Sequence, residues 1–198
     1  CFRDELYFLL VNQYGAFNSP VWFNVRLWHR YGIRGNGVNW WYNPETKQAE
    51  RVQNAYEHPG PSACFIQSLE DNLCDEGGIA DFWSREARVF KQGSGSGTNA
   101  SKVREQGAPT ATDGEASGVI SFLKVADYAA GAIKSGGGPR RAAKMVCLDV
   151  DHPDISAFIQ WKVDEERKAQ ALIAAGFSKG MEGEAYTTVS GQNANHSI

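Results

Sequence analysis

The sequence predicts an α/β fold on the strength of two observations. Short apolar runs of strand length alternate with longer stretches whose apolar residues recur at helical spacing, a pattern typical of strands joined by helices. The composition, with 42% hydrophobic and 22% charged residues, is that of an ordinary globular protein. At 198 residues, the chain is long enough for one sizeable domain or for half of a larger one.

The bulk properties exclude several classes of protein. The net charge is −3 and the basic residues are not clustered, so we expect no nucleic-acid partner. No apolar run approaches the ~20 residues that span a bilayer, and acids stand where a signal peptide has basic residues. We therefore expect a cytoplasmic protein without a membrane partner. The chain starts at Cys1 and stops at Ile198 inside an ordered pattern, which predicts a piece of a longer protein.

The first third of the chain predicts one helix and two irregular segments. Residues 2–14 have leucines at helical spacing and acids in the first turn, which favour a helix. Residues 17–24 are aromatic-rich and contain Pro20, so we expect an extended segment or loop. Residues 32–61 hold many Gly, Asn and Pro residues around Trp40-Trp41-Tyr42, a composition typical of a surface hairpin or excursion.

The remaining chain predicts strands and helices in alternation. Strands are expected at 63–68, 145–150, 185–190 and 193–198. Helices are expected at 78–92, 119–134, 151–161 and 164–175. The helix at 119–134 is apolar almost all round, which predicts burial on every side, and Asp151 is the expected N-cap of the helix after it.

Two glycine-rich stretches are candidate phosphate or nucleotide contacts. Residues 93–99 match neither a P-loop nor a dinucleotide-binding motif, so a flexible linker and a backbone phosphate cradle remain equally open. In residues 135–141, consecutive glycines and two arginines suit a phosphate or a base, and a mobile loop with solvated arginines is the alternative.

The cysteines, histidines and acids give no metal signature. The four cysteines show neither a C-x-x-C pair nor zinc spacing, and without further context each is expected to be a buried small hydrophobe; they are Cys1, Cys64, Cys74 and Cys147. Four groups between Asp149 and Asp154 could be interpreted as a metal cluster, but helix capping already accounts for the acids there. We therefore expect no metal site.

Seven segments, in this order, together resemble one known family. They are Ala16 to Asn24, Ser62 to Ser68, Gly93 to Asn99, Ala130 to Gly137, Arg140 to Met145, Asp151 to Ile155 and Gln192 to Asn195. The sequence resembles the class II, adenosylcobalamin-dependent ribonucleotide reductases over nearly its whole length. The run from Ala130 to Ile155 is the most specific and favours this class over the one with a separate radical-generating subunit.

The resemblance implies a fold and a domain organisation. The family has a ten-stranded α/β barrel of two five-stranded halves, and this chain resembles the first half, with helices at a dimer and effector face. One partial barrel domain, 1–198, is therefore expected. Residues 1–31 would form the entry helix and substrate-phosphate segment, 32–61 an insertion, and 62–198 the first barrel strands, effector-site helices and specificity loops.

The resemblance also implies radical chemistry on a ribonucleotide substrate, with adenosylcobalamin as the cofactor and a thioredoxin-type or dithiol reductant. Cys64 is similar to the first of the two redox-active cysteines. Ser19 matches a ligand of the substrate phosphate, and Ala63 and Gly93 match backbone contacts to the substrate. The thiyl-radical cysteine and the second redox cysteine have no counterpart here, so the chain alone is expected to be inactive without the remainder of the reductase chain.

An allosteric site follows from the same resemblance. Asp71 matches the acid that contacts the deoxyribose of a dNTP effector, and Arg104 matches a basic residue for its triphosphate. The loop that relays effector identity to substrate choice corresponds to Gly136, Gly137, Arg140 and Arg141. The helices at 78–92 and 119–134 are expected to pair with their mates in a homodimer.

Two other functions remain open from the sequence. One is the large subunit of a class I ribonucleotide reductase, which needs a partner subunit instead of cobalamin. The other is a nucleotide-binding regulatory module that keeps the effector site but has no catalytic activity.

Overall fold

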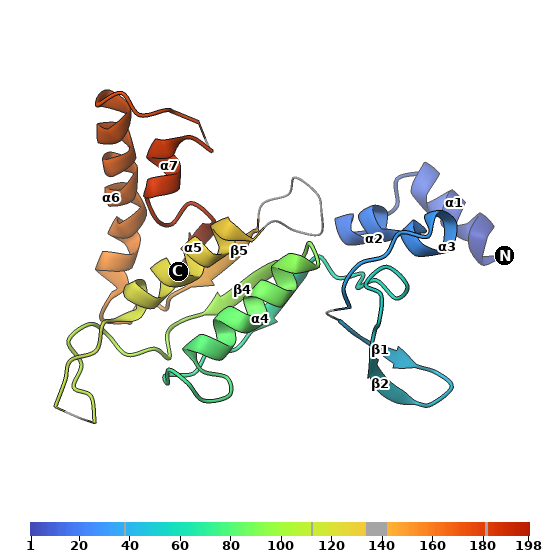
Figure 1. The fold of residues 1–198 in the computed structure, drawn as a ribbon, viewed down its shortest axis with the longest axis horizontal. Helices are drawn as coiled ribbons and strands as arrows, with labels where there is room; N and C mark the ends of the chain where they lie inside the picture. Colours follow the sequence, from blue (N-terminus) through green and yellow to red (C-terminus); the bar gives the residue numbers. More distant parts are fainter. Residues whose placement is uncertain (38, 112, 134–141, 181) are drawn as a thin grey trace. The chain divides into compact units, whose positions relative to one another are not determined.

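The computed structural model describes all residues except 38, 112, 134–141 and 181 (Figure 1). The chain divides into two compact units, Cys1–Ala63 and Cys64–Ile198. Among the described residues, none of the helices combines the length and the apolar character needed to cross a membrane.

The first unit contains three helices and a hairpin. They are α1 (Phe2–Val11), α2 (Ser19–Asn24), α3 (Leu27–Tyr31), β1 (Trp40–Asn43) and β2 (Gln48–Arg51). The two strands are antiparallel, with Trp40 opposite Arg51 and Asn43 opposite Gln48, so the hairpin predicted within 32–61 is confirmed. The extended segment predicted at 17–24 is wrong, because Pro20 lies in the first turn of α2, where its missing N–H group costs no hydrogen bond.

The second unit is built on a four-stranded parallel sheet, which confirms the α/β class. Its strands, in spatial order, are β3 (Cys64–Gln67), β4 (Gly95–Asn99), β5 (Lys144–Cys147) and β6 (Ala194–Ser197). Its helices are α4 (Ile79–Lys91), α5 (Val119–Ala132), α6 (Ile155–Ala174) and α7 (Glu184–Thr188). The long helices α4, α5 and α6 connect successive strands, as parallel pairing requires.

Three expectations about this unit need correction. Part of the glycine-rich stretch at 93–99 is strand β4, in which Ser96 and Thr98 are buried and alternate with glycines. The strand expected at 185–190 is largely helix α7, whose Thr188 hydroxyl donates to the Glu184 carbonyl (2.7 Å). The two helices expected at 151–161 and 164–175 are the single helix α6, because no helix-breaking residue separates them.

The core lies on one face of the sheet, under the helices. Its main cluster joins Phe82 of α4, Leu123 of α5, Phe158 of α6 and Val146 of β5. The strand side chains that are buried all point to this same face: Gln67, Ser96, Thr98, Lys144, Val146 and Ala194. Figure 1 shows α4 and α5 running along the sheet. The other strand residues, which point the opposite way, lie on a face that no described helix of this unit covers.

Within this chain, helix α5 is buried on its inner side only, and the burial of its other side, expected from a partner subunit, stays a prediction. Leu123, Ala126 and Ala130 are buried, whereas Val125 and Tyr128 are 47% and 50% exposed. The outer side of α5 is therefore open to solvent within this chain.

Candidate active and effector sites

The parallel sheet separates the predicted site residues into two sets. Cys64 begins β3, and Gly93 lies two residues before β4, so both are at the edge where the strands begin. Asp71 and Arg104 follow the ends of β3 and β4 and lie beyond the opposite edge. In this unit, the substrate candidates thus lie where the strands begin, and the effector candidates lie where the strands end.

Cys64 carries an exposed free thiol on the face of the sheet opposite the helices. It pairs with Gly95, and Ile66, two residues on and on the same face, is 94% exposed. Because no described helix of this unit packs on this face, the thiol is accessible to a reactant within Cys64–Ile198. The expectation of a buried small hydrophobe, which sequence alone gave for a cysteine, does not hold at this position.

On the open face beside Cys64, strand β4 has no side chain at Gly97. By register, Ile66, Gly97, Met145 and Asn195 form one row across the four strands. A methyl group added at Gly97 would meet only the Phe65 carbonyl oxygen, at 3.9 Å, so the packing of the described residues does not require glycine there. A glycine inside a strand commonly marks the close approach of a ligand or another backbone.

Two other substrate candidates lie at or beyond the division between the units. Ser19 is the first residue of α2 in the first unit, and Ala63 is the last residue of that unit. The contact of Ser19 with a substrate bound at Cys64 stays a prediction. Gly93 adopts φ +84°, a left-handed conformation that favours glycine, directly before the chain enters β4.

The two effector candidates contact each other. Arg104 Nε donates to Asp71 Oδ2 at 2.7 Å, and the Arg104 backbone N–H donates to Asp71 Oδ1 at 3.3 Å. A second ion pair, Lys102 Nζ to Glu70 Oε1 at 2.5 Å, lies on the neighbouring residues. Both pairs are partly exposed, so an incoming anion can reach their cationic groups.

His152 and Asp154 make hydrogen bonds that connect the loops at this edge. His152 is buried, its Nδ1 accepts from the Asp154 N–H (3.0 Å), and its Nε2–H therefore donates to the Val103 carbonyl (2.8 Å). Asp154 accepts from the Gln106 N–H (3.2 Å). Asp154, not Asp151, is the N-cap residue of α6, which corrects the predicted start of that helix. The described part of the chain contains no group of three or more potential metal ligands.

A buried ion pair, missed by sequence reasoning, joins α4 to the sheet. Lys144 Nζ lies 2.6 Å from Glu86 Oε2, and the two side chains are only 1% and 3% exposed. Burial raises the pKa of Glu86, although Lys144 and Ser96 act in the opposite direction. Glu86 lies on the buried side of α4, one turn after Phe82, but its partner is 58 residues away and no local pattern identifies it.

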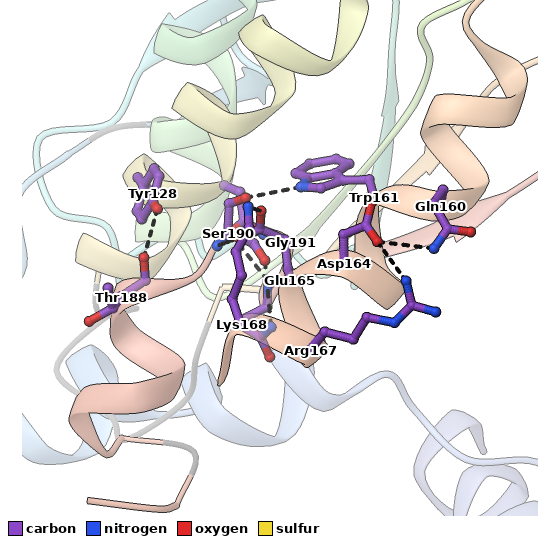
Figure 2. Close-up of polar contacts among 12 residues, drawn as sticks. Tyr128, Gln160, Trp161, Asp164, Glu165, Arg167, Lys168, Thr188, Ser190 and Gly191 are labelled. Carbon is purple, nitrogen blue, oxygen red and sulfur yellow. Dashed lines mark hydrogen bonds and ion pairs between the residues drawn. The ribbon is translucent and has the colours of Figure 1, made fainter. Parts of the chain in front are cut away.

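A polar network fixes the loop that leads into β6 (Figure 2). The Ser190 N–H donates to Glu165 (2.7 Å), and Trp161 Nε1 donates to the Ser190 hydroxyl (2.9 Å). Burial opposes the charge of Glu165, but hydrogen bonds from Lys168 and Ser190 outweigh it and lower the pKa of Glu165. Asp127 of α5 accepts from three successive backbone N–H groups of the loop, those of Gly191, Gln192 and Asn193.

A cavity of about 540 Å³ borders this network. Two of its polar lining groups already have partners: the Tyr128 hydroxyl donates to the Thr188 carbonyl (3.0 Å), and Lys168 pairs with Glu165 (2.6 Å), as Figure 2 shows. We assign these residues a structural role.

The predicted specificity loop cannot be placed. Gly136, Gly137, Arg140 and Arg141 lie outside the described residues. Their role in relaying effector identity stays a prediction.

Residues 62–186 match the family model described as the barrel domain of ribonucleotide reductase. The match covers the parallel sheet up to β5 with helices α4, α5 and α6, together with Cys64, Asp71 and Arg104. The chain therefore belongs to the ribonucleotide reductase family.

Several proteins similar to this chain carry the name vitamin B12-dependent ribonucleotide reductase. The chain is 56% identical over 173 residues to the vitamin B12-dependent ribonucleotide reductase of Agrobacterium fabrum, covering 87% of this chain and 14% of that protein. It is 47% identical over 197 residues to the enzyme of that name from Rhodopirellula baltica, covering 100% and 19%. A vitamin B12-dependent ribonucleoside-diphosphate reductase of Mycobacterium tuberculosis is 40% identical over 104 residues, covering 52% and 14%. The chain thus spans less than a fifth of the length of these relatives.

Proposed function

We propose that this chain supplies the first half of the ten-stranded catalytic barrel of an adenosylcobalamin-dependent ribonucleotide reductase, which converts ribonucleotides to deoxyribonucleotides. The observation that carries the proposal is the exposed thiol of Cys64, at the start of β3 on the open face of a parallel sheet. The barrel-domain match over 62–186 and the names of the similar proteins support it.

Cys64 acts in this proposal as one of two reductant thiols. It donates a proton to the 2′-hydroxyl of the ribose, which leaves as water when the C2′–O bond breaks. Cys64 and a second cysteine, from the remainder of the barrel, together lose two electrons and close into a disulfide. A dithiol such as a thioredoxin-type protein of the cytoplasm then reduces that disulfide by exchange.

The open face leaves room for a substrate to contact Cys64. Adenosylcobalamin, when bound, supplies the radical that starts the reaction; we assign it no ligand among the described residues. What this face offers is an accessible thiol beside the bare backbone of β4 at Gly97. The backbone at Ala63 and Gly93 and the side chain of Ser19 complete the proposed substrate contacts.

The opposite edge of the sheet serves as the effector site in the same proposal. A dNTP contacts Asp71 through its deoxyribose and Arg104 through its triphosphate. Because Arg104 pairs with Asp71 at 2.7 Å, the triphosphate must compete with the carboxylate for the guanidinium group. The exposed outer side of α5, with Val125 and Tyr128, pairs with α4 and α5 of a second copy in a homodimer.

The test is ribonucleotide reduction by the full-length protein, with dithiothreitol and with or without adenosylcobalamin. Cobalamin-dependent product formation is the expected result. Activity that instead requires a metal-loaded partner subunit would assign the protein to class I, and nucleotide binding without either activity would make it a regulatory module.

A further inference from the structure

Strand β3, which begins with Cys64, has little apolar burial to fix its alignment with β4. Gln67 is the one buried residue of the strand, and β3 pairs with β4 alone in the described sheet. Strand β4 contains two glycines, and its buried side chains, Ser96 and Thr98, are polar. Polar and glycine-rich strands specify their pairing register weakly. Leu69, just after β3, is buried in the core, but an apolar contact is not directional.

The Gln67 side chain makes a directional contact between the two strands. Its Nε2 donates to the Ser96 hydroxyl at 2.9 Å, and its main-chain carbonyl oxygen accepts from the Thr98 hydroxyl, also at 2.9 Å. All three residues are at most 9% exposed. Ser96 lies opposite Phe65 in the register, so the Gln67 amide reaches it diagonally across the helix face. Because a buried amide without a partner is costly, this contact favours the observed register over its neighbours.

The Ser96 hydroxyl is itself oriented by the buried ion pair. It hydrogen-bonds to the Glu86 carboxylate, which also accepts from Lys144 Nζ at 2.6 Å. A carboxylate only accepts, so the single hydroxyl proton of Ser96 points to Glu86. The Ser96 oxygen is then left to accept, which suits the N–H donor of Gln67. Gln67 thus ties β3 to α4 and β5 through buried side chains.

We propose that Gln67 is a positioning residue that keeps Cys64 opposite Gly95, where the proposed reduction needs its thiol. A slip of β3 by one residue would turn Cys64 to the helix face, and a slip of two would move it about 6–7 Å along β4. Either slip takes Gln67 away from Ser96. A misplacement of only about 1 Å can cost about a hundredfold in rate. The effect on turnover rests on the proposed function of Cys64, whereas the effect on β3 does not.

Gln67→Met in the full-length protein tests the proposal, because methionine has a similar length but no donor. Hydrogen exchange of the 64–67 backbone amides does not depend on activity and should be at least about threefold faster, since β3 opens more easily. With adenosylcobalamin and dithiothreitol, kcat should fall at least about tenfold. KM should stay within about twofold, because the proposed substrate contacts at Ser19, Ala63 and Gly93 are intact.

Matched variants separate this role from general damage. Gln48→Met makes the same substitution on the exposed strand β2 and should change neither hydrogen exchange at 64–67 nor turnover. Ser96→Ala removes the acceptor of the same hydrogen bond and should also lower kcat. The double variant Gln67→Met/Ser96→Ala should be within about twofold of the slower single variant, because one contact is lost in each case. Ser96→Ala, the smaller change, replaces Gln67→Met in the test if the latter does not fold.

Three results would overturn the inference. One is wild-type hydrogen exchange at 64–67 in folded Gln67→Met, whatever its turnover. Another is faster exchange with a wild-type kcat, which would show that loosening β3 does not displace the thiol. The third is a double variant in which the two losses of kcat multiply. If Cys64→Ser turns over like the wild type, the proposed function fails, and the hydrogen exchange of Gln67→Met still decides whether Gln67 holds β3.

Discussion

At the scale of single residues, the two faces of one sheet give reactive side chains opposite surroundings. Cys64 is exposed on the open face, where a reactant can reach it. His196, on the helix face, lies between the rings of Phe158 (4.4 Å) and Trp161 (4.8 Å). Burial, assisted by the positive charge of Lys162, lowers the pKa of His196 to about 4. The imidazole is thus kept neutral and structural, whereas the thiol stays available for chemistry.

His196 makes stability depend on pH in a defined window. Its pKa is about 4 when folded and about 6.5 when unfolded. Between these values the unfolded chain binds the extra proton, so stability is full above pH 6.5 and falls as the pH drops toward 4. The loss is about 3 kcal/mol at most. Urea unfolding from pH 4 to 7.5 should show this slope, and His196→Gln should reduce it; an unchanged slope in the variant would contradict the assignment.

Gly97 tests whether a substrate approaches the open face. Gly97→Ala and Gly97→Val should leave the free energy of unfolding within about 1 kcal/mol of wild type, because a Cβ at this position meets only the Phe65 carbonyl oxygen, at 3.9 Å. Turnover of the full-length enzyme should fall, more for valine than for alanine, as the side chain fills the space over β4. Normal turnover by the folded Gly97→Val enzyme would remove β4 from the substrate site.

At the scale of elements, the spacing of apolar residues predicted the regular helices. It did not predict elements whose structure depends on contacts with residues distant in the sequence. The amphipathic spacing at 78–92 and the almost entirely apolar stretch at 119–134 predicted α4 and α5 almost to their ends. Strand β4 was missed because its glycines and serine are weak strand formers and only Thr98 favours a strand; pairing with β3 and β5 and the burial of Ser96 and Thr98 stabilise it. Helix α7 was missed because its short Glu184–Thr188 sequence favours a strand locally.

The buried ion pair between α4 and β5 gives a test at this scale. Lys144→Met leaves the Glu86 carboxylate buried without its cation and should cost about 3–5 kcal/mol of stability. The double variant Lys144→Met/Glu86→Leu removes both charges and should recover most of that loss. Chemical denaturation measures both; a double variant as unstable as the single one would show that packing, not charge, sets the cost.

At the scale of the whole molecule, the substrate and effector candidates in the barrel unit lie at opposite edges of the parallel sheet. The sequence, through its resemblance, predicted both sets of residues, and the structure brings Asp71 and Arg104 together. The sequence could not predict the ion pair between these two residues or the buried contacts of Lys144, because both depend on strand register. Residues 62–186 match the barrel-domain model, and the chain spans less than a fifth of the length of the relatives compared above.

The effector edge can be tested without turnover. Arg104→Ala should weaken dNTP binding to the full-length protein at least tenfold, because a charge-assisted contact to the triphosphate is lost. The side chain is partly exposed, so the melting temperature should change little. Isothermal titration calorimetry provides the affinity, and an affinity equal to that of the wild type would remove Arg104 from the effector site.

The most direct test of the central claim is the number of deoxyribonucleotides that full-length Cys64→Ser makes per enzyme, with adenosylcobalamin and excess dithiothreitol. If Cys64 is one of the two reductant thiols, wild type should give cobalamin-dependent multiple turnovers and the serine variant should give none, since its hydroxyl cannot form the disulfide. Sustained turnover by the variant at the wild-type rate would contradict the role of Cys64 and the site built around it.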